Sequence, residues 1–170
     1  MKKMIFAVLL GFVFHALGQS VTPTQPTAPL ANFYAAGVSY NQAGAPPVGG
    51  TAFWAHLLNG SAQSTTKTYT FTVVDALANG TKPFTMNTNI GTGIAQQVTA
   101  VNGVPIYVPT TAGISWSGSN TGWQWSTGVA AAIHLKGNWY AYPAARVAKS
   151  SVSNGTGYQP ILTVMIGRGQ

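Results

Sequence analysis

Residues 123–143 read WQWSTGVAAAIHLKGNWYAYP, and alternate positions of this stretch differ in character. One parity is apolar: Trp123, Trp125, Val129, Ala131, Ile133 and Leu135. The other parity is small or polar: Gln124, Ser126, Gly128, His134 and Lys136. Because successive side chains of a β-strand point to opposite faces, the alternation predicts a strand over 123–135 with one apolar face. KGN at 136–138 then predicts a tight turn, after which WYAYP begins the next strand.

Similar segments recur along the chain and are separated by turn signals. Asn-Gly, the strongest short hairpin signal, occurs at 59–60, 79–80, 102–103 and 154–155. These turn signals predict eight strands, near 32–41, 51–58, 67–77, 83–98, 104–116, 123–135, 139–148 and 158–168. Several are longer than the five or six residues usual in soluble sheets and match the roughly 9–11 of a membrane-spanning strand.

The N-terminal region differs from the rest of the chain. Lys2 and Lys3 precede a short apolar run, and small residues follow at Ala16 and Gly18, which is the pattern of a secretory signal peptide over 1–18. Residues 19–31 are rich in Pro and Thr and predict an extended linker. The remaining residues, 32–170, are expected to form one β-domain.

The composition limits the possible functions. Only 5% of residues are charged, against about 25% in ordinary soluble domains, and Asp75 is the only acid. The basic residues after the signal are scattered, which argues against a nucleic-acid partner. With no cysteine, one acid, and His56 and His134 as the only histidines beyond the signal, we predict no catalytic, cofactor-binding or metal-binding residues.

Alternating strands fit two architectures, which place the apolar parity on opposite sides. A soluble sandwich turns it inward, whereas an outer-membrane barrel turns it toward lipid. The small, neutral polar parity suits the interior of a narrow barrel, and aromatic residues gather near predicted strand ends, as in barrel girdles. The predicted lipid-facing residues are Tyr69, Phe71, Val73, Trp123, Trp125, Val129, Ala131, Ile133, Leu135, Leu162, Val164 and Ile166. The predicted lumen residues are Gln124, Ser126, His134, Tyr140 and Arg146.

A signal peptide followed by eight strands of this kind resembles the small eight-stranded outer-membrane β-barrel proteins of Gram-negative bacteria, over about residues 32–170. The resemblance implies an all-β, eight-stranded antiparallel up-and-down transmembrane β-barrel in the bacterial outer membrane. It implies a monomer whose partners are outer-membrane lipid and the assembly machinery. The expected role is structural or in surface interaction and adhesion, with a lumen filled by side chains. The loops expected to take part are 42–50, 78–82, 117–122 and 149–157.

Two alternatives remain open at this stage. The first is a soluble β-sandwich exported to the periplasm or secreted, a lectin-like binding module or fibre subunit in which Trp123, Trp125 and Tyr140 stack on sugars. The second is a barrel enzyme that modifies lipids, with Asp75 and one of the histidines in a Ser/His/Asp triad.

The single acid has two possible environments. Asp75 either pairs with Arg146 inside the barrel or is solvated near a turn, where aspartate is common. With only one acid available, we expect no extended charged network in the lumen.

Overall fold

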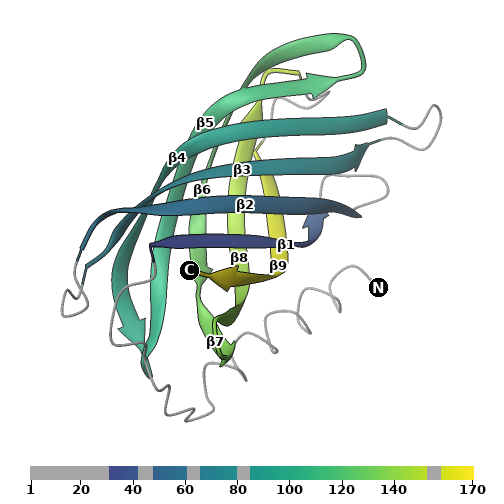
Figure 1. Ribbon diagram of the computed structural model, residues 1–170. Helices are drawn as coiled ribbons and strands as arrows, with labels where there is room; N and C mark the ends of the chain where they lie inside the picture. Colours follow the sequence, from purple (N-terminus) through teal and green to yellow (C-terminus); the bar gives the residue numbers. More distant parts are fainter. Residues whose placement is uncertain (1–30, 42–47, 61–65, 80–84, 153–157) are drawn as a thin grey trace.

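The computed structural model describes residues 31–41, 48–60, 66–79, 85–152 and 158–170 (Figure 1). The predicted signal peptide and all but the last residue of the predicted linker lie outside these ranges. No helix in the described part of the chain is long and apolar enough to cross a membrane.

The described residues form antiparallel strands that close into a ring (Figure 1). The strands are β1 Asn32–Asn41, β2 Val48–Asn59, β3 Thr68–Asn79, β4 Thr85–Val101, β5 Val104–Ser117, β6 Asn120–Ala131, β7 Ile133–Lys136, β8 Trp139–Ser150 and β9 Gln159–Gly169. The strands from β1 to β6 pair consecutively, β9 pairs with both β8 and β1, and both β6 and β7 pair with β8. Because β7 continues β6 beyond Ala132, these two segments together count as one strand of the ring. The ring therefore has eight strands. The predicted up-and-down eight-stranded barrel is therefore confirmed, and the alternative of a two-sheet sandwich is wrong.

The up-and-down order gives the barrel two distinct ends. At one end, here called the terminal end, β1 begins and β9 ends, and the β2–β3, β4–β5 and β7–β8 connections lie there. At the other, the loop end, lie the connections β1–β2, β3–β4, β5–β6 and β8–β9. The four loops expected to take part in surface interaction all belong to the loop end.

Tight turns occur where the sequence predicts them. Asn102 and Gly103 both have positive φ, 50° and 79°, and form the two-residue link between β4 and β5. This left-handed geometry is the reason that Asn-Gly is favoured in hairpins. Gly137 in KGN has a φ of 58° and likewise begins a two-residue link, from β7 to β8. The Asn-Gly pair at 154–155 and Gly80 lie outside the described residues.

Inward-facing glycines lie opposite large inward side chains on neighbouring strands. Gly93 pairs with Phe71, and Gly128 pairs with Arg146. A Cβ atom built on Gly93 would lie 1.9 Å from the carbonyl oxygen of Thr110, so no larger residue fits there without moving the backbone. Close strand approach on one side and a bulky neighbour on the other explain why this position holds glycine.

Candidate functional site

The outer wall of the barrel is apolar and exposed. The structure places Trp123, Val129 and Leu135 from the opening stretch on it, each about half exposed. Val164 and Ile166 of β9 are also exposed, while Trp125, Ile133 and Leu162 are partly covered. Other large exposed apolar residues are Tyr34, Val38, Trp54, Val74, Ile90, Ile94, Ile114, Trp139 and Val147. That this wall contacts lipid stays a prediction.

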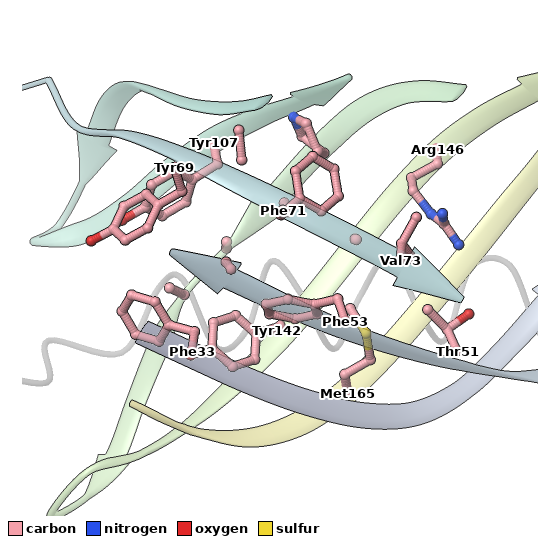
Figure 2. Close-up of a pocket in the computed structure, with 17 residues that line it drawn as sticks. Phe33, Thr51, Phe53, Tyr69, Phe71, Val73, Tyr107, Tyr142, Arg146 and Met165 are labelled. Carbon is pink, nitrogen blue, oxygen red and sulfur yellow. The ribbon is translucent and has the colours of Figure 1, made fainter. Parts of the chain in front are cut away.

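Three residues predicted to face lipid point into the barrel instead. Tyr69, Phe71 and Val73 of β3 are buried, and all three line an internal cavity (Figure 2). The outward parity of β3 is formed largely by threonines, whose hydroxyls can bond to backbone carbonyls, as Thr70 does to His56. The sequence prediction was wrong here because an apolar lumen and a threonine-rich outer wall reverse the usual polarity of a barrel strand.

Ala131 was also predicted on the lipid side, and this too is wrong. It is 5% exposed and lines the same cavity as Ala130 and Ala132. The chain is irregular where β6 ends and β7 begins, so simple alternation does not continue through this point.

Aromatic side chains border the outer wall near both ends. At the terminal end, Tyr34 pairs across strands with Trp54 and with Arg168, and Arg168 in turn pairs with Trp139. We call Tyr34, Trp54 and Trp139 the terminal girdle.

The second set lies at the loop end and consists of Trp123, Trp125 and Tyr158, here called the loop girdle. The Trp125 and Tyr158 rings are 5.9 Å apart, and the Lys149 ammonium lies 5.5 Å from the centre of the Tyr158 ring. Between the two girdles, the outward positions of the described strands carry no Asp, Glu, Lys or Arg.

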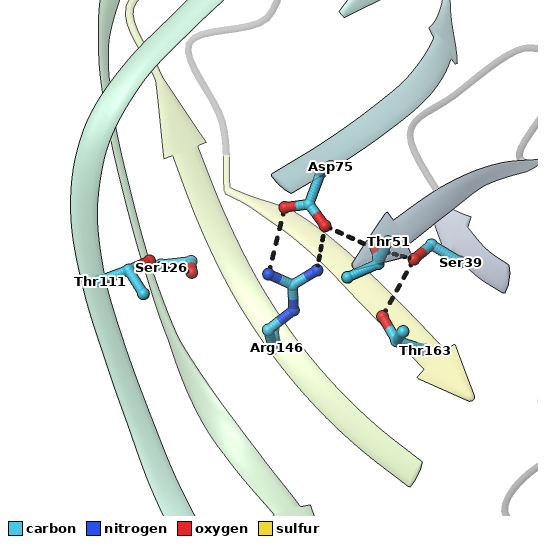
Figure 3. Close-up of polar contacts among 7 residues, drawn as sticks. All are labelled: Ser39, Thr51, Asp75, Thr111, Ser126, Arg146 and Thr163. Atoms are coloured by element: carbon cyan, nitrogen blue, oxygen red, sulfur yellow. Dashed lines mark hydrogen bonds and ion pairs between the residues drawn. The ribbon is translucent and has the colours of Figure 1, made fainter. Parts of the chain in front are cut away.

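A buried ion pair crosses the lumen toward the loop end (Figure 3). Both guanidinium nitrogens of Arg146 donate to the carboxylate of Asp75, at 2.6 and 3.1 Å. The two side chains are 6% and 3% exposed. Their strands, β8 and β3, are separated by three strands in either direction round the ring, so the pair spans the barrel. The ion-pair hypothesis for Asp75 is confirmed, and the solvated alternative is wrong.

Hydroxyl groups extend this polar layer along the wall (Figure 3). Thr51 donates to Asp75 at 2.6 Å, and Ser39 bonds to Thr51 and, at 3.1 Å, to Thr163. The single acid of the chain is thus paired with Arg146, and it accepts one further hydrogen bond from the neutral hydroxyl of Thr51.

Two further predicted lumen residues lie on the other side of the interior. Ser126 is buried and bonds to Thr111 at 2.8 Å (Figure 3). Gln124 is 3% exposed, and its amide nitrogen has no hydrogen-bond partner among the described residues. Both side chains therefore occupy the lumen side, in agreement with the parity of the opening stretch.

An aromatic layer fills the lumen toward the terminal end. Phe33 of β1 packs edge-on against Tyr69 at 5.4 Å and against Tyr140 at 5.6 Å between ring centres. Phe53 meets Tyr142 at 5.1 Å. Tyr140, a predicted lumen residue, is buried in this layer. These contacts join strands that are not neighbours in the sheet, so the rings meet within the barrel.

A cavity of about 90 Å³ lies between the aromatic layer and the ion pair (Figure 2). Its lining is aromatic and aliphatic except for Thr51, Arg146 and the hydroxyl groups of Tyr69, Tyr107 and Tyr142. The Tyr142 hydroxyl is buried and has no hydrogen-bond partner among the described residues. Sequence reasoning missed this cavity. A signal was present, because Asp75 shares the parity of Tyr69, Phe71 and Val73, and a lone acid in an apolar wall is expected to face inward.

The structure does not bring together the residues of the hypothetical triad. His56 lies exposed on the outer face, with Nδ1 2.9 Å from Asn32 Oδ1. His134, the last predicted lumen residue, is half-buried at the terminal end, where Nε2 lies 2.7 Å from the carbonyl oxygen of Gly137. Asp75 lies inside the barrel toward the loop end and is held by Arg146.

Two other kinds of site can also be checked against the described residues. Within them, no group of three or more His, Cys, Asp or Glu side chains could hold a metal ion. Trp123 and Tyr140, proposed together as a sugar platform, lie on opposite faces of the wall.

Comparison with known proteins shows a likeness of shape and none of sequence. No model of a known protein family matches the chain, and no curated protein matches it. One similar solved structure, described as "De novo design of transmembrane beta-barrels", is 10% identical, with a TM-score of 0.44. The match covers 84% of this chain and 98% of that one.

Proposed function

We propose that this chain is an integral β-barrel protein of the bacterial outer membrane, with a structural or surface-interaction role and without catalytic activity. The observation that carries the proposal is the outer wall, which is largely apolar, with threonine as its main polar residue, and carries no charged side chain between the two aromatic girdles in the described strands. A wall of this kind is costly in water, because large exposed apolar patches promote association, but it suits a hydrocarbon layer bordered by aromatic side chains.

The strand lengths support the same placement. The eight strands of the ring each contain a continuous segment of 10 to 17 strand residues. A tilted strand needs about 9–11 residues to cross a bilayer. Closure of the ring satisfies the backbone groups that an open sheet edge would expose to lipid.

The side chains that fill the lumen support the proposal that the barrel does not conduct large solutes. The Asp75–Arg146 pair crosses it at one level, and the rings around Phe33 cross it at another. An eight-stranded barrel is just wide enough for side chains to fill its interior. Contact with partners is therefore assigned to the loop end, at which β1, β3, β5 and β8 end.

Cell fractionation tests the membrane location directly. The mature form should be found in the outer-membrane fraction, lack residues 1–18, and migrate differently on a detergent gel before and after boiling. We also expect it to purify as a monomer. Recovery in the soluble fraction with no mobility shift upon boiling would overturn the proposal.

The tryptophans offer a finer test, because all five lie on the outer wall. In bilayers of brominated phospholipid, their fluorescence should be quenched, more strongly by bromine near the carbonyl region than by bromine at the chain end. Four of the five belong to the girdles that we place at the interfaces: Trp54, Trp123, Trp125 and Trp139. Absence of quenching from either bromine position contradicts a lipid-facing wall.

A further inference from the structure

We infer that the cavity between the aromatic layer and the ion pair is a binding site for a small apolar molecule, a hydrocarbon unit of about four carbons. This inference concerns the interior of the barrel and does not depend on the membrane location proposed above.

The chemistry of the lining selects an apolar ligand. The cavity walls are formed by rings and aliphatic groups such as Phe53, Phe71, Val73 and Met165. A polar ligand would lose its hydrogen bonds to water on entering such a site, and nothing in the apolar part of the lining replaces them.

The two polar residues of the lining other than tyrosine are already engaged. Arg146 gives two hydrogen bonds to Asp75, and Thr51 donates its hydroxyl proton to the same carboxylate. Arg146 therefore offers the cavity mainly the methylene part of its side chain, as long basic residues commonly do. The surface that the lining presents to the cavity is almost entirely apolar, so a ligand that needs a charged partner would have to break the buried ion-pair layer.

The walls are also built so that the space does not simply collapse. The ring of strands is closed, and Tyr142 and Phe53 support each other edge-on at 5.1 Å. Protein interiors rearrange only partly around a void, so a framework of this kind retains it.

The volume sets the size of the occupant. An engineered apolar cavity of about 150 Å³ binds benzene or xenon, so about 90 Å³ suits a somewhat smaller hydrocarbon unit. A small free hydrocarbon and the methyl end of a lipid chain share this chemistry. The experiment below separates these two sources.

The methionines provide an internal and an external reporter. Met165 lines the cavity and is 6% exposed, whereas Met86 is 44% exposed on the outer wall. The full mature barrel is labelled with ¹³C-methyl methionine and folded in a fluorinated surfactant. This sample contains no hydrocarbon chains that would compete for the cavity. Cyclobutane should shift the Met165 methyl resonance in a saturable way and move Met86 only linearly. If the protein proves water-soluble, the same titration is done in buffer.

Variants on adjacent residues give a matched control. Ala144 lines the cavity and Ala145 is exposed on the outer wall. Ala144→Leu should abolish the saturable Met165 shift, and Ala145→Leu should leave it within about twofold. If Ala144→Leu does not fold, Ala55→Val inside and Ala52→Val outside form a second pair, in which the inner change should weaken binding at least about threefold.

Polarity and source of the ligand are tested in the same sample. Cyclobutanone should bind at least about fivefold more weakly than cyclobutane relative to its free concentration, because its carbonyl loses hydrogen bonds to water. A nuclear Overhauser contact between the Met165 methyl and the terminal methyl of added phospholipid would assign the site to a lipid chain. Cyclobutane binding without that contact assigns it to a free hydrocarbon. No saturable Met165 shift with either molecule, or equal binding of ketone and hydrocarbon, would overturn the inference.

Discussion

Replacing Asp75 by Asn should destabilise the barrel strongly, because it leaves the Arg146 charge buried without a counter-charge. In the native protein both guanidinium nitrogens donate to the carboxylate, and the Arg146 side chain is only 6% exposed. Removing one partner of a buried ion pair costs about 3–5 kcal/mol. Since asparagine retains one acceptor oxygen and is nearly the same size, the loss reports charge rather than packing. We therefore expect the free energy of unfolding to fall by about 3–5 kcal/mol.

The assay is equilibrium unfolding in urea with the protein inserted in lipid vesicles, followed by tryptophan fluorescence and by mobility of unboiled samples. Thr51→Val is a useful comparison, because it removes a single hydrogen bond to the carboxylate, which contributes about 1.5–3 kcal/mol when the acceptor is charged.

A double variant completes the test. Asp75→Leu with Arg146→Leu removes both charges, and exchanging a buried ion pair for apolar residues is often neutral or stabilising. The double variant should therefore be more stable than Asp75→Asn. The reasoning fails if Asp75→Asn unfolds within about 1 kcal/mol of the native protein, or if the losses of the two single leucine variants simply add in the double variant.

Three further outcomes follow from the wall and its turns. Gly93→Ala should lower the free energy of unfolding by more than about 2 kcal/mol. The reason is that the alanine Cβ would lie 1.9 Å from the Thr110 carbonyl oxygen, so the backbone has to move. Gly50→Ala, where the nearest atom is 3.8 Å away, is the matched control and should change that free energy by less than about 0.5 kcal/mol. Ile94→Arg, near the middle of β4 and 48% exposed, should cost about 2–4 kcal/mol in vesicles, whereas a cost near zero would indicate a wall in water. Gly103→Ala, at a φ of 79°, should destabilise the β4–β5 turn by about 1 kcal/mol in the same urea assay, and an unchanged midpoint would contradict the left-handed geometry.

The strands could be predicted from the sequence because their boundaries are marked by local chemistry. Asn102-Gly103 and the KGN turn need left-handed backbone, and the observed φ angles confirm it. The opening stretch also sorts its two faces correctly as far as Val129. Alternation failed at Ala131, where the chain is irregular, because a period of two assumes a regular strand.

The inner side of β3 could not be predicted from hydrophobicity alone. Alternation tells which residues share a face but not which face is inside. In this barrel the interior is partly apolar and the outer face of β3 carries threonines, so Tyr69, Phe71 and Val73 were assigned to the wrong side. The polar residue that shares their parity, Asp75, is the better guide, because a charge is excluded from an apolar outer wall.

The cavity and the ion pair depend on contacts between distant segments. Asp75 and Arg146 are 71 residues apart in the chain, and no local pattern brings them together. They meet because a ring of eight strands in this order places β3 opposite β8. A contact set by the circumference of the ring is visible only once the ring is known.

That arrangement has a consequence for how the barrel is assembled. A sheet that has not yet closed leaves the carboxylate on β3 and the guanidinium on β8 apart. An unpaired charge is strongly unfavourable away from water. Joining the last edges should therefore coincide with neutralising both charges, which disfavours half-closed sheets. The ion pair therefore favours a ring of eight strands, because a ring with one strand more or one strand fewer would hold the two charges apart.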